Sequence, residues 1–181
     1  MFNRDKTLFM PFILTAFVVI LDQLTKAIIV RNWPQPGTII MDVFNNDFLL
    51  LYHVRNTAIA FSIGEGLPQP YRFILFIIVP IIVLFFLTWY YFTTTEFSRL
   101  QRWAIAGIIG GGIGNISDRI FRDEGVVDFI SVRFYGIFGL ERWPTFNVAD
   151  ASVVICCMIL LFTILKPNRK NFEKKWGPYN E

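Results

Sequence analysis

The chain has 181 residues, of which 54% are hydrophobic and only 17% are charged, and its mean hydropathy is +0.49. This composition excludes a disordered or fibrous chain, and the long uncharged runs exclude an ordinary water-soluble domain. The formal charge is +3, but basic residues in a membrane protein commonly set its orientation, and no nucleic-acid-binding motif accompanies them. We therefore predict an integral membrane protein that does not bind nucleic acid.

Four apolar segments predict four membrane-spanning helices, at residues 8–30, 73–92, 103–119 and 148–165. The second segment has no charged residue, and its single proline is an interruption that membrane helices tolerate. The third contains glycine pairs at i, i+4 spacing, Gly107 with Gly111 and Gly110 with Gly114, which let another helix approach closely. The predicted fold is α-helical: one membrane domain over residues 1–181, built as a four-transmembrane-helix bundle.

Two segments between the predicted helices differ in character from the spans. Residues 38–44 and 48–54 are rich in β-branched, aromatic and aliphatic side chains, and the turn residues Asn45, Asn46 and Asp47 separate them. This pattern predicts a hairpin, and thus a small extracytoplasmic β-sheet, within an outer β region at about 38–62. Residues 120–145 mix aromatic and charged side chains, which is typical of a segment that lies in the membrane interface.

The distribution of basic residues predicts that both termini are cytoplasmic. Nine of them fall in the short segments 1–7, 93–102 and 166–181, and seven fall in the much longer segments 31–72 and 117–145. Because basic residues concentrate on the cytoplasmic side, the two longer segments are expected to lie outside.

Ionisable residues within spans are costly to bury, so each is a candidate for function. Asp22 and Lys26 are four residues apart on one face of the first helix, where they can form a neutralising structural pair. Asn115, Asp118 and Arg119 follow the glycines of the third helix, where an Asp-Arg ion pair at the headgroup level is the simpler interpretation.

Two aspartates stand out when they are taken together. Asp128 is surrounded by apolar residues, and Asp150 lies near the start of the fourth helix, where Asn147 and Asp150 also have the spacing of a capping box. Both fall on the predicted outer side at similar depth. Two carboxyl groups in partly apolar surroundings can share one proton, so that one activates water while the other polarises a carbonyl, as in aspartic proteases.

Other chemistries have less support in the residues. The only histidine is His53, expected at the surface of a strand, so a Ser-His-Asp triad or a histidine-based zinc site has almost nothing to use. Two alternatives stay open on composition alone. One is a metal-dependent transferase that uses the acidic cluster of Asp118, Asp123, Glu124 and Asp128. The other is a proton-coupled transporter or a scaffold built around Asp22 and Lys26.

Five sequence motifs, in order, resemble those of the bacterial lipoprotein signal peptidase family, also called signal peptidase II. The matching stretches are Leu21–Lys26 (LDQLTK), Asn56–Ser62 (NTAIAFS), Gly111–Arg119 (GGIGNISDR), Val126–Phe129 (VVDF) and Phe146–Asp150 (FNVAD). The resemblance covers nearly the whole chain. The second motif of the family usually reads Asn-x-Gly-Ala-Ala-Phe, and Ala58 and Ile59 depart from it here.

The resemblance implies an aspartic endopeptidase of the bacterial cytoplasmic (inner) membrane, with its active site near the outer face. It would cleave prolipoproteins immediately before a diacylglyceryl-modified cysteine, with Asp128 and Asp150 as the catalytic pair. The residues that would bind substrate or support the site are Asn56, Asn115, Arg119, Asn147, Asp22, Lys26 and Asp118. The family's β-cradle would correspond to residues 38–62 and its interfacial helix to part of 117–145. We expect a monomer in contact with membrane lipid, with no metal or other cofactor.

Overall fold

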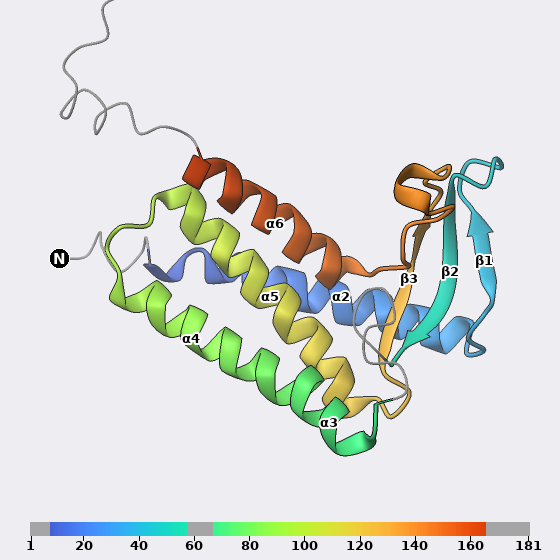
Figure 1. The fold of residues 1–181 in the computed structure, drawn as a ribbon, viewed down its shortest axis with the longest axis horizontal. Coiled ribbons are helices and arrows are strands. Elements are labelled where there is room, and N and C mark those ends of the chain that lie inside the picture. The colour runs from blue at the N-terminus through green and yellow to red at the C-terminus, as the bar shows by residue number, and fades with distance from the viewer. Residues whose placement is uncertain (1–7, 58–66, 166–181) are drawn as a thin grey trace, which may run out of the picture.

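A helical bundle and a small sheet at one end of it form the molecule (Figure 1). The computed structural model describes residues 8–57 and 67–165, so residues 58–62 of the predicted outer β region, including Ala58 and Ile59, lie outside it. The helices are α2 (Phe12–Asn32), α3 (Gln69–Phe73), η2 (Ile74–Ile78, a π-helix), α4 (Val79–Thr93), α5 (Arg99–Phe121) and α6 (Val148–Leu165). The strands are β1 (Ile39–Asp42), β2 (Leu49–Asn56) and β3 (Val126–Val132), and a 3-10 turn, η3, covers Ile137–Gly139.

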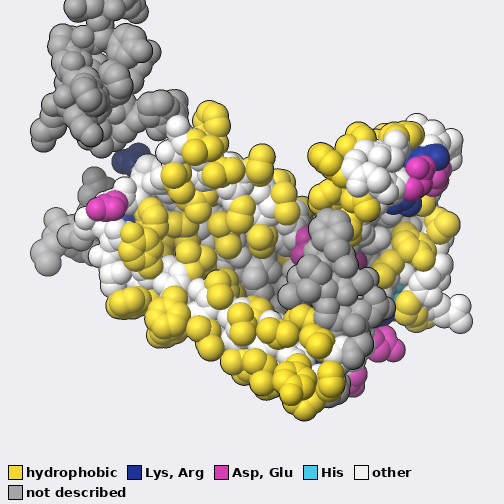
Figure 2. Space-filling model, in the orientation of Figure 1, with side chains coloured by type: hydrophobic (Ala, Val, Ile, Leu, Met, Phe, Trp, Pro, Cys, Tyr) yellow, Lys and Arg dark blue, Asp and Glu magenta, His cyan; other side chains and the backbone are white. Residues whose placement is uncertain are grey.

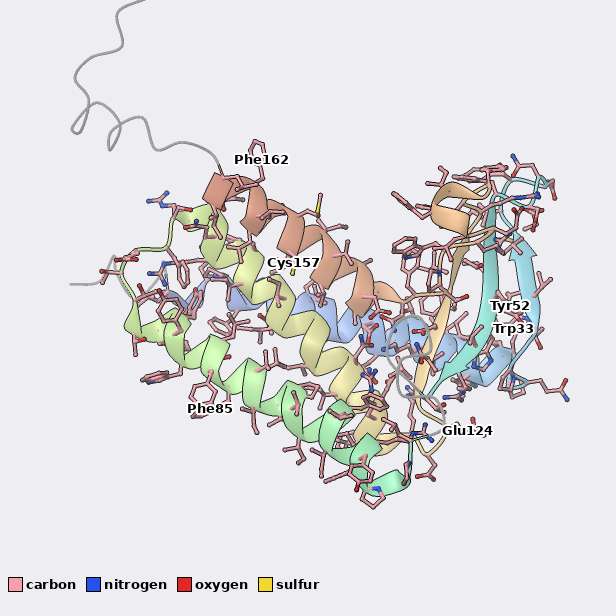
Figure 3. All side chains as sticks on the ribbon, in the orientation of Figure 1. Trp33, Tyr52, Phe85, Glu124, Cys157 and Phe162 are labelled. Carbon is pink, nitrogen blue, oxygen red and sulfur yellow. The ribbon has the colours of Figure 1, made fainter. Side chains whose placement is uncertain are left out.

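Three helical stretches of the described residues are long and apolar enough to cross a membrane: Phe12–Asn32, Pro70–Thr93 and Val148–Leu165. Their most apolar windows have mean hydropathies of 2.0, 2.7 and 2.5. Their outward faces are apolar: Phe85 on α4 and Phe162 on α6 point away from the bundle (Figure 3) and are 64% and 67% exposed. Figure 2 shows hydrophobic side chains spread over this part of the molecule. An apolar surface of this extent favours contact with lipid over contact with water.

Helix α5 is the central helix of the bundle and packs against α2, α4 and α6. It is less apolar than the other three, and many of its side chains are buried among them. Its glycines bring the neighbouring helices close: a Cβ at Gly111 would overlap the carbonyl oxygen of Ala149 in α6, and one at Gly110 would lie 3.0 Å from the carbonyl oxygen of Thr15 in α2. The predicted role of these glycines in close helix packing is confirmed.

The sheet is antiparallel, with the strand order β1-β2-β3. The predicted hairpin is confirmed as β1 and β2, joined through the turn that contains Asn45 and Asp47, both at positive φ. Residues 120–145, predicted only as an interfacial segment, also contribute the third strand, in which Asp128 pairs with Val54 of β2. The helical conformation that the structure shows after β3 in this segment is the short turn η3.

The expectation that His53 lies at the surface is wrong. Its side chain is fully buried between the sheet and the end of α2, and its Nδ1 lies 2.7 Å from the carbonyl oxygen of Trp33. Burial lowers the pKa of this imidazole, because a charged ring would lose its hydration there. His53 therefore helps to pack β2 against the C-terminal end of α2.

Because α5 and α6 approach closely, we predict that alanine destabilises the protein more at Gly111 than at the adjacent Gly112. In Gly111→Ala the added methyl meets the backbone of Ala149, whereas in Gly112→Ala it meets only the side-chain end of Leu84, which can rotate away. We expect Gly111→Ala to cost about 1–3 kcal/mol of stability, as overpacking does, and Gly112→Ala to cost less. Thermal unfolding of both variants in the same detergent measures this, and equal unfolding temperatures would contradict the packing described.

Candidate active site

A cavity of about 1120 Å³ lies where the sheet meets the helices. Polar side chains from four elements of the fold share its wall: Asn56 from β2, Asn115 and Arg119 from α5, Asp128 from β3 and Asp150 from α6. The rest of the lining includes apolar residues of η2, α4 and α6, such as Phe76, Pro80 and Val154. Figure 2 shows acidic side chains inside the hollow between the helices and the sheet. The cavity therefore has one polar end and one lipid-like side.

Asp128 is almost completely buried, with 1% of its surface exposed. Two amides donate to its carboxyl group: Asn56 Nδ2 to Oδ2 at 2.9 Å and Asn147 Nδ2 to Oδ1 at 2.7 Å. Burial raises the pKa of Asp128 to about 7, with the nearby charge of Asp150 adding to the rise and the two amide donors opposing it. At neutral pH this carboxyl group is therefore poised to hold or release a proton.

Asp150 lies in the first turn of α6, where the predicted capping box is confirmed. The backbone N–H of Asp150 donates to Asn147 Oδ1 at 2.9 Å, and the backbone N–H of Asn147 donates back to Asp150 Oδ2 at 3.2 Å. The other carboxyl oxygen accepts from Asn115 Nδ2 at 2.7 Å. Asp150 is thus a helix cap and a cavity-lining carboxylate at the same time, so the two interpretations of its sequence position are compatible.

Asn147 connects the two aspartates. It is fully buried, its side-chain amide donates to Asp128, and its backbone N–H donates to Asp150. The same side-chain amide also lies 3.1 Å from Asn115 Oδ1. Because Asn147 donates hydrogen bonds to both carboxyl groups, the position of one relative to the other depends on the conformation of Asn147.

Behind these amides lies a buried ionic cluster centred on Lys26. Its ammonium group lies 2.8 Å from Asp22 Oδ2 and 3.0 Å from Asp118 Oδ2, and the side chains of all three residues are fully buried. It also donates to Asn115 Oδ1 at 3.0 Å, which orients the Asn115 amide so that its Nδ2 faces Asp150. The predicted pairing of Asp22 with Lys26 is confirmed, and Asp118 is its second anionic partner.

Each anion of this cluster also holds a backbone group beside one of the cavity aspartates. Asp22 Oδ1 accepts from the N–H of Ala149, the residue before Asp150, at 3.0 Å. Asp118 Oδ2 accepts from the N–H of Val127, the residue before Asp128, at 3.1 Å. The cluster therefore connects α2 and α5 to the two chain segments that carry Asp150 and Asp128.

Two further residues complete the surroundings. Arg119 lines the cavity, and its guanidinium donates to the carbonyl oxygen of Asn115 at 3.3 Å. Gln23, for which we predict no role, donates to Asp118 Oδ1 at 2.9 Å and to the carbonyl oxygen of Gly114 at 3.1 Å. Its place next to Asp22 in the first motif is the only sequence signal that could have indicated this role.

The alternative based on an acidic metal cluster has little support in the geometry. Asp118 faces Lys26 and Arg122, and Asp123 and Glu124 are exposed in the turn after α5. Within residues 8–57 and 67–165, no group of three or more His, Cys, Asp or Glu side chains is placed to hold a metal ion. The transporter alternative is built around Asp22 and Lys26, and these two residues are fully buried in an ion-pair cluster with Asp118 and are not among the residues that line the cavity.

A family model described as Signal peptidase (SPase) II matches residues 14–166. The chain belongs to the signal peptidase II family. It is 47% identical over 157 residues to a lipoprotein signal peptidase of Treponema denticola, covering 87% of this chain and 88% of that protein. It is also 42% identical over 166 residues to one from Treponema pallidum, with 92% and 88% covered, and 45% identical over 169 residues to one from Borrelia turicatae, with 93% and 95% covered.

The fold matches two solved structures that are each described as a bacterial membrane enzyme. The first has a TM-score of 0.74 and 27% identity, with 95% of this chain and 94% of that chain covered. The second has a TM-score of 0.72 and 29% identity, with 88% and 94% covered. The four-helix bundle with its small sheet, a multi-pass membrane architecture, is thus the fold of the signal peptidase II family.

The ionic cluster makes a stability prediction. Lys26→Met leaves Asp22 and Asp118 as buried carboxylates without their shared cation, and we expect a loss of about 3–5 kcal/mol. Arg122→Gln removes a side chain that is 23% exposed and forms an ion pair with Asp118, so we expect a loss of at most about 1 kcal/mol. Chemical unfolding of both variants in mixed micelles compares them. A Lys26→Met protein that is as stable as Arg122→Gln would contradict the central position of Lys26.

Proposed function

We propose that Asp128 and Asp150 are the catalytic pair with which this signal peptidase II removes signal peptides from prolipoproteins, cleaving immediately before the diacylglyceryl-modified cysteine. The observation that carries the proposal is that Asn147 bonds both carboxyl groups at the wall of one cavity. Neutral amides hold both carboxyl groups, and Arg119 is a nearby cation at the same cavity wall. Such a pair can keep one proton between two carboxyl groups.

The reaction needs one acid and one base. Asp128, whose pKa is raised to about 7, holds the proton at rest and donates it to the oxygen of the scissile carbonyl. Asp150 acts as the base and takes a proton from water as the water oxygen attacks the carbonyl carbon. The resulting tetrahedral intermediate collapses when the proton on Asp150 passes to the leaving amine and the proton of the carbonyl-derived hydroxyl returns to Asp128. Both carboxyl groups then regain their starting states.

The neighbouring residues position this pair and the substrate. Asn56, Asn115 and Asn147 hold the carboxyl groups in place through neutral hydrogen bonds, which leave the shared proton free to move. Arg119 is a cation at the cavity wall that can bind a carbonyl oxygen of the substrate backbone. Asp22, Lys26 and Asp118 act from behind, through Asn115 and the backbone groups of Ala149 and Val127.

The position of the cavity fits a substrate that arrives from the bilayer. Its apolar side is lined by η2, α4 and α6, on which the acyl chains of a lipid-modified cysteine can lie, while the polar end receives the scissile bond. The sheet lies at the end of the bundle opposite the first residues of α2 and the last residues of α6 (Figure 1). With the distribution of basic residues, this supports an orientation with both termini in the cytoplasm and the site at the outer face of the cytoplasmic membrane. We propose that the chain acts as a monomer.

The catalytic assignment predicts the behaviour of three aspartate variants. Purified Asp128→Asn and Asp150→Asn are expected to lose at least about 10³-fold in kcat on a diacylglyceryl-modified prolipoprotein, because the general acid or the general base is missing. Asp123→Asn, at an exposed position five residues before Asp128, is the matched control and should cleave like the wild type. The assay contains excess EDTA, and the unfolding temperature of each variant shows whether it is folded.

Two outcomes would contradict the assignment. Activity retained by a folded Asp128→Asn or Asp150→Asn protein would show that the pair is not catalytic. Loss of wild-type activity in EDTA, or a large loss in Asp123→Asn, would favour the acidic-cluster alternative instead.

A further inference from the structure

We infer that residues 143–146, here called the strap, bind the prolipoprotein chain as an added β-strand through the backbone of Thr145. The strap joins the η3 loop to the start of α6 and runs along β3 (Figure 1). The inference rests on the proposed function, since it concerns how the same substrate is aligned at the same cavity. It assigns a positioning role to a backbone segment that has no catalytic side chain.

The strap pairs with β3 in the antiparallel manner. Phe146 and Ile130 exchange two backbone hydrogen bonds, Phe146 N to Ile130 O at 3.0 Å and Ile130 N to Phe146 O at 2.8 Å. Trp143 N also donates to Val132 O at 2.9 Å. The strap is therefore attached to β3 at both of its ends, by an isolated bridge at Phe146 and a single hydrogen bond at Trp143, and its side toward β3 is occupied there.

The second edge is free at Thr145. The backbone groups that the strap gives to β3 belong to Trp143 and Phe146, and Thr145, which lies between them, gives β3 none. Among residues 8–57 and 67–165, neither backbone group of Thr145 has a hydrogen-bond partner. Pro144, the residue before it, has no N–H to offer. The edge thus presents one donor and one acceptor at a single residue.

This free edge faces the site where substrate must lie. All four strap residues line the cavity that holds Asp128 and Asp150. Asn147, which bonds both aspartates, directly follows the strap. A peptide in extended conformation would place its own N–H and C=O groups opposite those of Thr145, and the register of that pairing would set which peptide bond reaches the aspartates.

The test compares the backbone of Thr145 with its side chain. Steady-state cleavage of a synthetic diacylglyceryl-modified prolipoprotein peptide by the full chain in detergent gives KM and kcat for each variant. Thr145→Pro removes the N–H, and Thr145→Ala keeps both backbone groups. We expect the KM of Thr145→Pro to exceed that of Thr145→Ala about fivefold, as the loss of one hydrogen bond predicts, with kcat changed less than twofold.

A matched control tests the effect of proline itself. Thr95 is exposed in the connection between α4 and α5, at the far end of the bundle, and Thr94 before it already has φ −87° and ψ 146°, which a following proline permits. Thr95→Pro should therefore cleave like the wild type.

A second measurement uses the wild-type enzyme, so it does not depend on whether Thr145→Pro folds. Peptides carry a single N-methyl group at successive positions around the scissile bond, each blocking one backbone N–H. Because Thr145 offers a single acceptor, pairing predicts that KM rises at one position and not at its two neighbours. Equal effects at neighbouring positions would overturn the inference, as would a folded Thr145→Pro whose KM equals that of Thr145→Ala. Cleavage by the Asp128→Asn or Asp150→Asn variant would instead overturn the proposed function, so the two failures are distinguishable.

Discussion

The structure depends on the burial of one ammonium group, that of Lys26, between two carboxylates. A buried charge is tolerated only when its partners and hydrogen bonds replace the lost water, and Lys26 has Asp22, Asp118 and the amide oxygen of Asn115 around it. The two carboxylates also accept hydrogen bonds from the backbone N–H groups of Ala149 and Val127. One ionic cluster thus fixes two segments that are far apart in sequence, and the residues that follow them are Asp150 and Asp128. Apolar side chains in place of Asp22, Lys26 and Asp118 could fill the same space, but they could not accept hydrogen bonds from these two backbone N–H groups.

The two aspartates at the cavity are held differently from the two behind them. Asp22 and Asp118 contact a cation, whereas Asp128 and Asp150 accept hydrogen bonds from the amides of Asn56, Asn115 and Asn147. A neutral donor orients a carboxyl group and favours its charged form less strongly than a cation does. The amides of Asn56 and Asn147 lower the pKa of Asp128, but burial outweighs them and raises it to about 7. The division of four acids into a pair that contacts a buried cation and a cavity pair that accepts hydrogen bonds from amides is the central electrostatic feature of the site.

Much of this arrangement could be predicted from the sequence, because local patterns carry it. The α6 boundaries, the hairpin turn at Asn45–Asp47, the glycine contacts of α5 and the capping box at Asn147 all follow from spacing and side-chain type. What escaped prediction depends on contacts between distant segments. These contacts are the ion pair of Asp118 with Lys26, the hydrogen bonds of Gln23, the burial of His53, the pairing of β3 with the hairpin and the contact of the strap with β3. Apolar runs predict a span equally well whether its helix faces lipid or lies at the centre of the bundle, as α5 does.

The proposed mechanism requires a proton on Asp128 near neutral pH, and infrared spectroscopy of the carboxyl groups tests this most directly. The purified protein is titrated from pH 5 to pH 9, and the carbonyl stretch of protonated carboxyl groups is followed in the wild type and in Asp128→Asn. Because the pKa of Asp128 is raised to about 7, the wild type should lose one protonated carboxyl group as the pH rises through about 7, and Asp128→Asn should show no such loss. A wild-type protein with no protonated carboxyl group titrating in this range, or the same titration in Asp128→Asn, would contradict the account.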